Sequence, residues 1–437
     1  MVTVIAVLLA VAAVLPWIID EGPRWYYHID FDVYRKGGEA FLAGDNLYTR
    51  DYEMLGINLP FTYPPLAAIL FAPLAWIPFS IGALAMTLVT VAALWWCIVI
   101  VARHALPGRA LTDHRVLATW ILPVALVIEP VRETLSFGQV NVLLMAMVLV
   151  DTLTSRPWLP RGVFIGLAAA IKLTPAVFVL VFVVRRQWRE AATTVASGVG
   201  FTLLAAVISP ANSLTYWLDT LSDPSRIGGL SFTSNQSVRG VLTRFAEPDV
   251  ETSSLPWLLL VVVSLAAIIT ALVLIDRAAA RTGGSPTVGI VLVTSLVALL
   301  CSPVSWSHHW TWLALFAVFF AARAWQVAPG AYRRTAGVLA PGISFIALTG
   351  PHWLLPNREN REHDWSLWAQ PVGNSYVLLA VLILVTALVM PRLMVTGDRR
   401  PADGATGSPG GAGRIWSWVP LVVLAPMLVT VPFYAFF

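Results

Sequence analysis

Hydrophobic residues along this chain gather into long apolar runs that are separated by short polar stretches. Such runs are typical of helices that cross a bilayer, and a straight span needs about 20 residues. Several runs are shorter, so we expect their helices to tilt or to extend into the adjoining loops. The runs cover residues 2–19, 80–102, 116–128, 139–151, 162–184, 191–208, 255–275, 288–303, 310–322, 336–350, 376–390 and 419–437. The pattern predicts an all-α polytopic membrane protein of about 11–13 transmembrane helices.

Composition excludes an ordinary soluble domain. Hydrophobic residues make up 58% of the 437 residues and charged residues 12%, against roughly 25% charged residues in soluble domains. The run 2–19 lacks a basic leader, so we interpret it as a retained helix and not as a cleaved signal peptide. The 2 cysteines fall in apolar runs, so they predict neither a disulfide framework nor a zinc site.

Proline interrupts two of the apolar stretches. The run 162–184 carries Lys172 and Pro175 near its middle, and proline disfavours helix at the preceding residue. We therefore predict a broken helix at 172–175 that enters and returns from the cytoplasmic side. Broken helices at membrane depth occur where they line a polar cavity or are buried in protein. The stretch 65–78 is predicted to lie in the interface or to pack as a short re-entrant piece.

The charge distribution predicts the orientation. With the N-terminus inside, the cytoplasmic loops hold 17 Lys and Arg against 6 Asp and Glu, while the opposite loops hold 10 against 18. This asymmetry follows the positive-inside rule. The asymmetry accounts for the net positive charge of the chain, so this charge is no argument for a nucleic-acid partner. We expect one integral membrane domain over 1–437, an external site to which loops 20–62 and 210–254 contribute, and a flexible cytoplasmic linker at 397–413.

Two carboxylates, Asp30 and Asp32, follow the first apolar run among aromatic residues. On a strand they would share one face, whereas on a helix they would diverge by ~200°. A partly buried carboxylate beside a hydroxyl can accept its proton as a general base. The alternative is a solvated loop or an N-cap for the amphipathic stretch 33–42.

Lys172 is the ionisable residue deep in a predicted span, which favours a functional cation with an anionic partner such as phosphate. The alternative is a lysine that snorkels to the interface. His308 and His309 stand at an external span junction, where they suggest phosphate contact or proton handling. The alternative there is interfacial anchoring beside tryptophans. We find no metal-ligand spacing around these histidines.

Further polar and aromatic residues are predicted on the external side. Amides and aromatic rings are the groups with which proteins bind sugars, although each alone can be a turn or cap. Arg239 is a candidate for phosphate, because its planar fork can meet two phosphate oxygens. The sugar-binding or lipid-binding candidates are Tyr34, Tyr63, Gln139, Asn141, Asn235, Gln236 and Trp306.

Seven short motifs occur in order along residues 16–312. Together they resemble the polyprenyl-phosphate-mannose-dependent α-mannosyltransferases of the actinobacterial envelope, which are of the GT-C type. The resemblance is greatest to the branch that adds an α-1,2-linked mannose to phosphatidylinositol mannosides. The motifs are Asp30-Phe31-x-Val33-Tyr34, Gly44 with Leu47-Tyr48, Phe61-x-Tyr63-x-Pro65, Gly138-Gln139-x-Asn141, Lys172-Leu173-x-Pro175, Asn235-Gln236-Ser237 and Ser302-Pro303-x-Ser305-Trp306-x-His308-His309.

This resemblance implies an external active site in the plasma membrane with a catalytic carboxylate in the first external loop. By register with the motif, that carboxylate is Asp30, and Asp32 is the second choice. The resemblance also implies a polyprenyl-phosphate mannose donor, a phosphatidylinositol mannoside acceptor and inversion in one displacement. It implies no nucleotide cofactor, and the mechanism that it implies does not require a divalent ion. Lys172, Arg239, His308 and His309 are the expected phosphate-binding set.

Two alternatives stay open from the sequence. One is an α-mannosyltransferase that branches lipomannan or lipoarabinomannan. The other is a lipid or solute transporter, since a broken helix with a central lysine also suits a carrier. The long external loops and the concentration of candidate residues on one side favour the enzyme.

Overall fold

The structure, a computed structural model, describes residues 28–54, 56–155, 157–223, 226, 228–246, 254–357 and 359–397. The predicted runs 2–19 and 419–437 lie outside the described residues, as does nearly all of the predicted linker 397–413. Statements on structure below concern the described residues.

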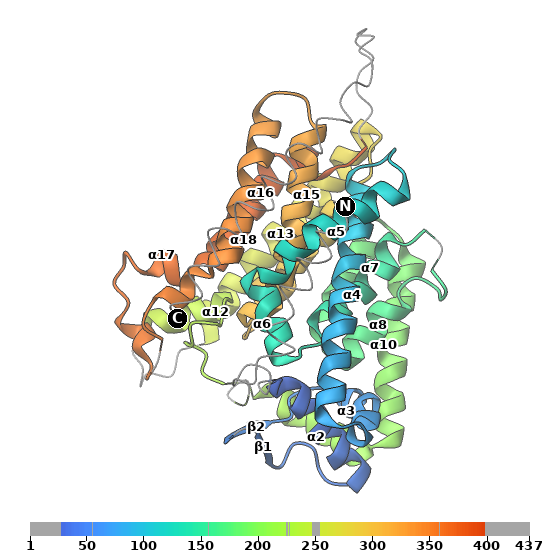
Figure 1. The fold of residues 1–437 in the computed structure, drawn as a ribbon, viewed down its shortest axis with the longest axis vertical. Helices are drawn as coiled ribbons and strands as arrows, with labels where there is room; N and C mark the ends of the chain where they lie inside the picture. The colour runs from blue at the N-terminus through green and yellow to red at the C-terminus, as the bar shows by residue number, and fades with distance from the viewer. Residues whose placement is uncertain are drawn as a thin grey trace.

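Helices dominate the fold, as the sequence predicts. Each predicted apolar run between residues 80 and 390 contains a helix, which confirms the all-α membrane class (Figure 1). The helices of these runs are α4 (Phe79–Ala105), α5 (Leu111–Val127), α7 (Asn141–Leu153), α8 (Val163–Ile171), α9 (Val179–Val184), α10 (Trp188–Ile208), α13 (Ser254–Thr282), α14 (Thr287–Cys301), α15 (Trp312–Gln326), α16 (Ala331–Thr349) and α18 (Ser375–Val389).

Shorter elements lie mostly at the ends of these helices, and Figure 1 shows α2, α3 and the hairpin together at the lower end. The strands β1 (Asp51–Met54) and β2 (Ile57–Pro60) pair antiparallel in a hairpin that the sequence analysis did not predict. The short α-helices are α2 (Ile29–Ala43), α3 (Pro65–Phe71), α6 (Glu129–Phe137), α11 (Pro210–Leu218), α12 (Val238–Phe245) and α17 (Gln370–Gly373). The 3-10 helices are η2 (Ala72–Trp76), η3 (Thr174–Phe178), η4 (Thr220–Ser222), η6 (Ser307–Thr311), η7 (Pro351–Leu354), η8 (Arg361–Asp364) and η9 (Pro391–Met394).

By length and composition, 3 of the described helices can cross a bilayer, namely α4, α10 and α13. A fourth span results if α5 and α6, which are bent by 75° at Ile128, are counted as one. Shorter apolar helices of 10–17 residues surround them. The chain is therefore a multi-pass membrane protein, and the total of about 11–13 spans stays a prediction.

The helix break predicted at 172–175 is present. Helix α8 ends where Lys172 takes an extended conformation (φ −148°, ψ 124°), and the chain continues through η3, with Pro175 in its first turn, into α9. The break at Ile128 between α5 and α6 was not predicted. There the residue before Pro130 begins a new helix, and Pro130 stands in its first turn, where its missing N–H costs nothing.

Helix α2 is held against α3 and η2 by a close backbone approach at Gly38. A Cβ atom at this position would lie 2.8 Å from the carbonyl oxygen of Phe71 and 2.9 Å from Cα of Ala72. Next to it, a Cβ at Gly37 would collide with the ring of Phe61. The paired glycines therefore set the position of α2, and with it the position of Asp30 near the start of the helix.

Gly38→Ala is expected to lower both stability and activity, because the added methyl group meets backbone atoms that have little room to move. Overpacking of this kind costs about 1–3 kcal/mol. The matched control is Gly200→Ala in α10, where a Cβ meets nothing within 4 Å. Thermal unfolding in detergent checks this prediction. Equal melting temperatures for the two variants would show that α2 shifts without cost.

Candidate active site

Asp30 and Asp32 lie on helix α2 and point in different directions, as the helical alternative predicts. The Oδ2 atom of Asp30 accepts a hydrogen bond of 2.8 Å from Nε2 of Gln139. Asp32 instead forms an ion pair with Arg35 one turn later, with 3.3 Å between Oδ1 and Nη1. Burial raises the pKa of Asp30 to about 6, although the Gln139 hydrogen bond and the Lys172 charge oppose this shift. Asp30 is therefore the carboxylate that faces the other candidate residues.

Gln139 reaches Asp30 because Gly138 turns the chain sharply between α6 and α7. Gly138 has a φ of 67°, which ends α6 in the left-handed region. A Cβ there would also lie 2.7 Å from Cβ of Phe31. Glycine therefore serves both the turn and the close packing of α2 on this junction.

Two tyrosines fix the amide of Gln139. Tyr34 donates from its hydroxyl to Oε1 of Gln139 at 3.0 Å, and Tyr63 donates to the same oxygen at 3.3 Å. The two hydroxyl oxygens are 3.1 Å apart. Since Oε1 is occupied by these donors, the amide nitrogen is directed at Asp30.

Lys172 lies at the end of α8, where the helix breaks. Its Nζ donates to Oδ1 of Asn141 at 2.9 Å and lies 3.3 Å from Nε2 of His309. An ammonium group only donates, so Nε2 of His309 accepts and the ring proton of His309 belongs on Nδ1. The ammonium also lies 5.5 Å from the centroid of the Tyr63 ring. Through its contact with Tyr63, Lys172 thus links the group around Asp30 and Gln139 to the histidines.

The main chain of His308 anchors η6 beside Lys172. Its carbonyl oxygen accepts from Oγ1 of Thr134 at 2.9 Å and from Nδ2 of Asn141 at 3.0 Å. The buried ring packs on His309, with centroids 4.7 Å apart. Among the residues that the structure describes, neither ring nitrogen of His308 has a hydrogen-bond partner.

The structure thus brings eight predicted site residues into one group. They come from α2, the entry to α3, the α6–α7 junction, the α8 break and η6, which are far apart in the sequence. No described group of three or more His, Cys, Asp or Glu residues could hold a metal ion. The site residues are Asp30, Tyr34, Tyr63, Gln139, Asn141, Lys172, His308 and His309.

Four other candidates have no described hydrogen bond or ring contact between their side chains and this group, although the main chain of Trp306 accepts from that of His309 at 2.7 Å. The amide nitrogen of Gln236 donates to the carbonyls of Thr233 and Gly373, each at 2.8 Å. Asn235 pairs with Trp306 in a β-bridge, and its side chain bonds the main chain around it. These contacts indicate that both amides organise the loops. Arg239 lies over the ring of Trp257, with 4.9 Å between Cζ and the centroid.

Several buried charged residues were missed by the sequence analysis, among them Glu129 and Arg244. Glu129 accepts from the hydroxyl of Tyr376 at 2.6 Å and from Nε1 of Trp353 at 2.8 Å. Arg244 donates to the main-chain carbonyl of Asn235 and to Oδ1 of Asn374. Glu129 ties α6 to the C-terminal part of the chain, whereas Arg244 ties α12 to the 231–235 loop and to Asn374. Their position at the edge of polar stretches gave no signal that distinguishes them from solvated charges.

The apolar helix bundle, the carboxylate of Asp30 on α2 and the lysine at the break of α8 fit a membrane-embedded glycosyltransferase. The chain belongs to glycosyltransferase family 87, whose profile matches residues 61–303. This membership removes the transporter alternative.

Curated relatives cover most of the chain. It is 36% identical over 398 residues to a polyprenol-phosphate-mannose-dependent alpha-(1-2)-phosphatidylinositol mannoside mannosyltransferase of Mycobacterium tuberculosis, covering 88% of this chain and 90% of that protein. A protein of the same description from Mycolicibacterium smegmatis is 37% identical over 399 residues, covering 86% and 87%. A phosphatidylinositol pentamannoside mannosyltransferase of Mycobacterium tuberculosis is 34% identical, covering 90% of each chain. No solved structure matches the chain at a significant level.

Proposed function

We propose that this protein transfers mannose from polyprenyl-phosphate mannose to a phosphatidylinositol mannoside and forms an α-1,2 linkage. Relatives over most of the chain carry this description. The observation that carries the proposal is the group formed by Asp30, Gln139 and Lys172, which offers a base and a phosphate-binding cation in one site. The relatives differ in acceptor, and the shorter phosphatidylinositol mannosides are the acceptors that we propose.

Asp30 acts as the general base. Gln139 occupies Oδ2, and among the described residues no hydrogen bond involves Oδ1, which leaves that oxygen for the acceptor hydroxyl. As the acceptor oxygen attacks the anomeric carbon, its proton passes to Asp30, and the bond from that carbon to the phosphate oxygen breaks. One base suffices for such an inverting displacement. In this account Gln139 positions Asp30 and does not bind sugar directly.

Lys172 and the histidines receive the leaving phosphate. The ammonium of Lys172 is held by Asn141 and His309 in a place where negative charge develops on the leaving group. Fixed charges aimed at developing charge are the strongest catalytic devices in sites shielded from water. The unpartnered ring of His308 is the second donor that we assign to the phosphate. We assign Arg239 to contact with the donor phosphate as the lipid enters the site.

Purified protein given polyprenyl-phosphate mannose and short phosphatidylinositol mannosides should yield lipids heavier by one hexose. Mass spectrometry of the lipids measures this gain, and linkage analysis of the product should show α-1,2. Transfer to lipomannan, with no transfer to any phosphatidylinositol mannoside, would show that the acceptor is the branched glycan. Absence of any transfer would overturn the proposal.

The pH dependence of transfer should report the ionisation of Asp30. A base must be unprotonated, so activity should fall as pH drops through about 6, the pKa to which burial raises this carboxyl. Gln139→Leu removes a hydrogen bond that lowers this pKa. The acid limb of the kcat/KM profile should therefore move to higher pH in the Leu variant. An unmoved limb would show that Gln139 acts elsewhere, for example on the sugar.

We also propose that the site opens to the external side of the plasma membrane, because the loops at the other end of the helices carry the excess of basic charge that marks the cytoplasmic side. Exposed Thr49 follows α2, and exposed Ala110 precedes α5 in a predicted cytoplasmic loop. A cysteine at Thr49 should react with an impermeant thiol reagent on intact spheroplasts, whereas a cysteine at Ala110 should react only after lysis. The reverse pattern would place the site inside.

A further inference from the structure

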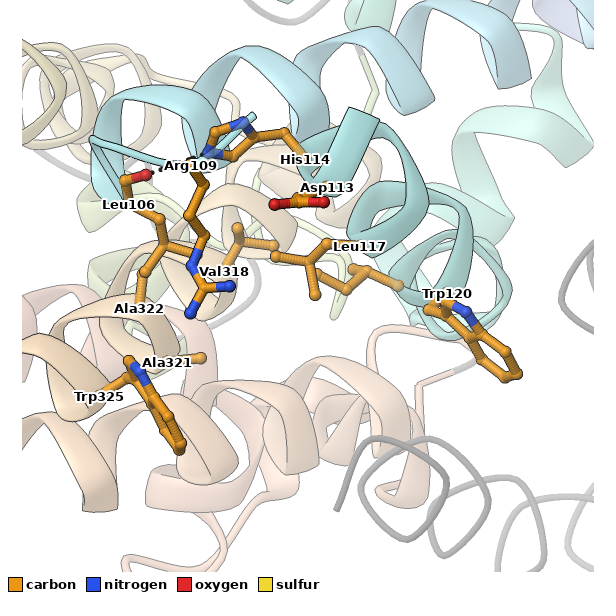
Figure 2. A pocket seen from close by; sticks show the side chains of 11 residues that line it. Leu106, Arg109, Asp113, His114, Leu117, Trp120, Val318, Ala321, Ala322 and Trp325 are labelled. Carbon is orange, nitrogen blue, oxygen red and sulfur yellow. Dashed lines mark hydrogen bonds between the residues drawn. The ribbon is translucent and has the colours of Figure 1, made fainter. Parts of the chain in front are cut away.

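A pocket of about 190 Å³ lies between α5 and α15 (Figure 2). It is lined by the C-terminal half of α15, whereas the site residues of η6 come just before the N-terminal end of that helix. Both helices pack on α4. Their facing stripes provide the walls, with Leu117 and Ile121 from α5 and Val318 and Ala322 from α15. An apolar cavity of roughly 150 Å³ in a protein stays dry and can hold a benzene molecule. The pocket is therefore large enough for a segment of an apolar chain.

Its mouth carries a cation. Figure 2 shows the side chain of Arg109 extending toward Val318 and Ala322. Asp113 also lines the pocket, yet no described acidic group lies within 4.0 Å of the Arg109 guanidinium. The surrounding stretch 103–115 holds Arg103, Arg109 and Arg115 against one acid. The lining itself holds one cation and one acid, so the positive excess comes from the arginines beside the pocket, and within the described residues Arg109 has no acidic partner that would keep it from an anion.

Two buried polar atoms in the lining lack partners. Nδ1 of His114 and Nε1 of Trp120 make no hydrogen bond within the described part of the chain. His114 is 2% exposed, and its Nε2 is already bonded to the carbonyl of Leu106 at 3.1 Å. Buried donors and acceptors without partners are rare in folded proteins. A ligand with a polar atom beside His114, on the Arg109 side of the pocket, would satisfy Nδ1 of this histidine.

The pocket lies at the level expected for the lipid headgroups. Trp325, which lines the pocket at the end of α15, is 49% exposed. Exposed tryptophans of membrane proteins concentrate at the level of the lipid headgroups. By the charge distribution this end of the bundle faces the cytoplasm. Basic pockets between membrane helices on that side bind anionic headgroups.

We propose that this pocket binds an anionic glycerophospholipid of the cytoplasmic leaflet, with an acyl chain between α5 and α15 and the phosphate at Arg109. The first apolar run, residues 2–19, is the competing occupant. It contains no acidic residue that could pair with Arg109, so the cation favours the lipid. The site is separate from the proposed transfer reaction, so its test does not depend on activity.

The test compares phosphatidylglycerol with phosphatidylcholine of the same acyl chains, added to the full-length protein in detergent. Phosphatidylglycerol should raise the melting temperature more, because a ligand that binds the folded state stabilises it. Arg109→Gln should lose most of this preference. Arg115→Gln is the matched control, since Arg115 lies in the first turns of α5, close to Arg109 in sequence, and is exposed but does not line the pocket. Ala321→Phe, which fills the pocket from an exposed position on α15, should lose the response to both lipids.

The outcomes are distinct. Retention of phosphatidylglycerol by the wild type and by Arg115→Gln in native mass spectrometry, and its loss in Arg109→Gln, would support the site. Equal loss of phosphatidylglycerol in both arginine variants would show a diffuse electrostatic attraction and would overturn the proposed site. A disulfide between cysteines placed at Val7 and Ala322, with no lipid retained, would show that the chain's own first run fills the pocket and would also overturn it.

Discussion

Asp30→Asn is expected to insert, fold and bind both lipids, yet to lose nearly all mannosyl transfer. Asparagine keeps the size and the contact with Gln139 but cannot accept the acceptor proton. General-base catalysis of this kind contributes ~10²–10⁴-fold to the rate. Turnover by Asp30→Asn should therefore fall by about this factor, with thermal stability close to that of the wild type.

The matched control is Asp32→Asn on the same turn of α2. Its carboxylate pairs with Arg35 at a solvent-accessible position, and exposed ion pairs contribute little to stability. This variant should retain most of the activity in the same preparation. An active Asp30→Asn together with an inactive Asp32→Asn would move the base by two residues and contradict the geometry. Equal losses would mean that the two carboxylates act as a unit.

Lys172→Met is expected to impair use of the donor far more than folding. The methionine keeps most of the apolar stem but leaves Asn141 and His309 without the ammonium between them. Loss of a single oxyanion-stabilising donor typically costs about 10²–10³ in kcat. Lys172→Arg should rescue in part, because a guanidinium is charged but has a different reach and shape.

The control for this variant is Arg239→Met, since Arg239 stacks on Trp257 and no described contact joins it to the site. Single-turnover rates at saturating donor separate the phosphate role from lipid entry. Lys172→Met is expected to slow the chemical step, whereas Arg239→Met is expected to change mainly the affinity for the donor. Normal single-turnover rates in Lys172→Met would make the lysine structural.

The sequence predicted the components of the site better than its geometry. Lys172 was identifiable because a cation within an apolar run needs a partner, and Pro175 marked the helix break. Asp30 followed from its motif, but the choice between strand and helix for its segment depended on tertiary packing. Only the close approach at Gly38 and the turn at Gly138 show why α2 presents Asp30 to Gln139.

Other side chains look alike in sequence whether they bind substrate or hold loops. Gln236 and Gln139 are both amides in short polar motifs, yet Gln236 is saturated by main-chain carbonyls, whereas Gln139 meets a carboxylate. Arg244 and Glu129 stand among other charged residues in polar stretches and were overlooked. These roles depend on hydrogen-bond partners that are far away in the chain, and the local sequence does not indicate which partners those are.

The proposed reaction requires one site that unites the base Asp30 with the phosphate-binding Lys172. A structure of the protein with a phosphonate analogue of the donor, which resists cleavage, tests this most directly. The phosphonate is expected at Lys172 and His308, with the anomeric carbon facing Oδ1 of Asp30 on the side opposite to the phosphonate. A phosphonate bound at Arg239, or a mannose held away from Asp30, would contradict it.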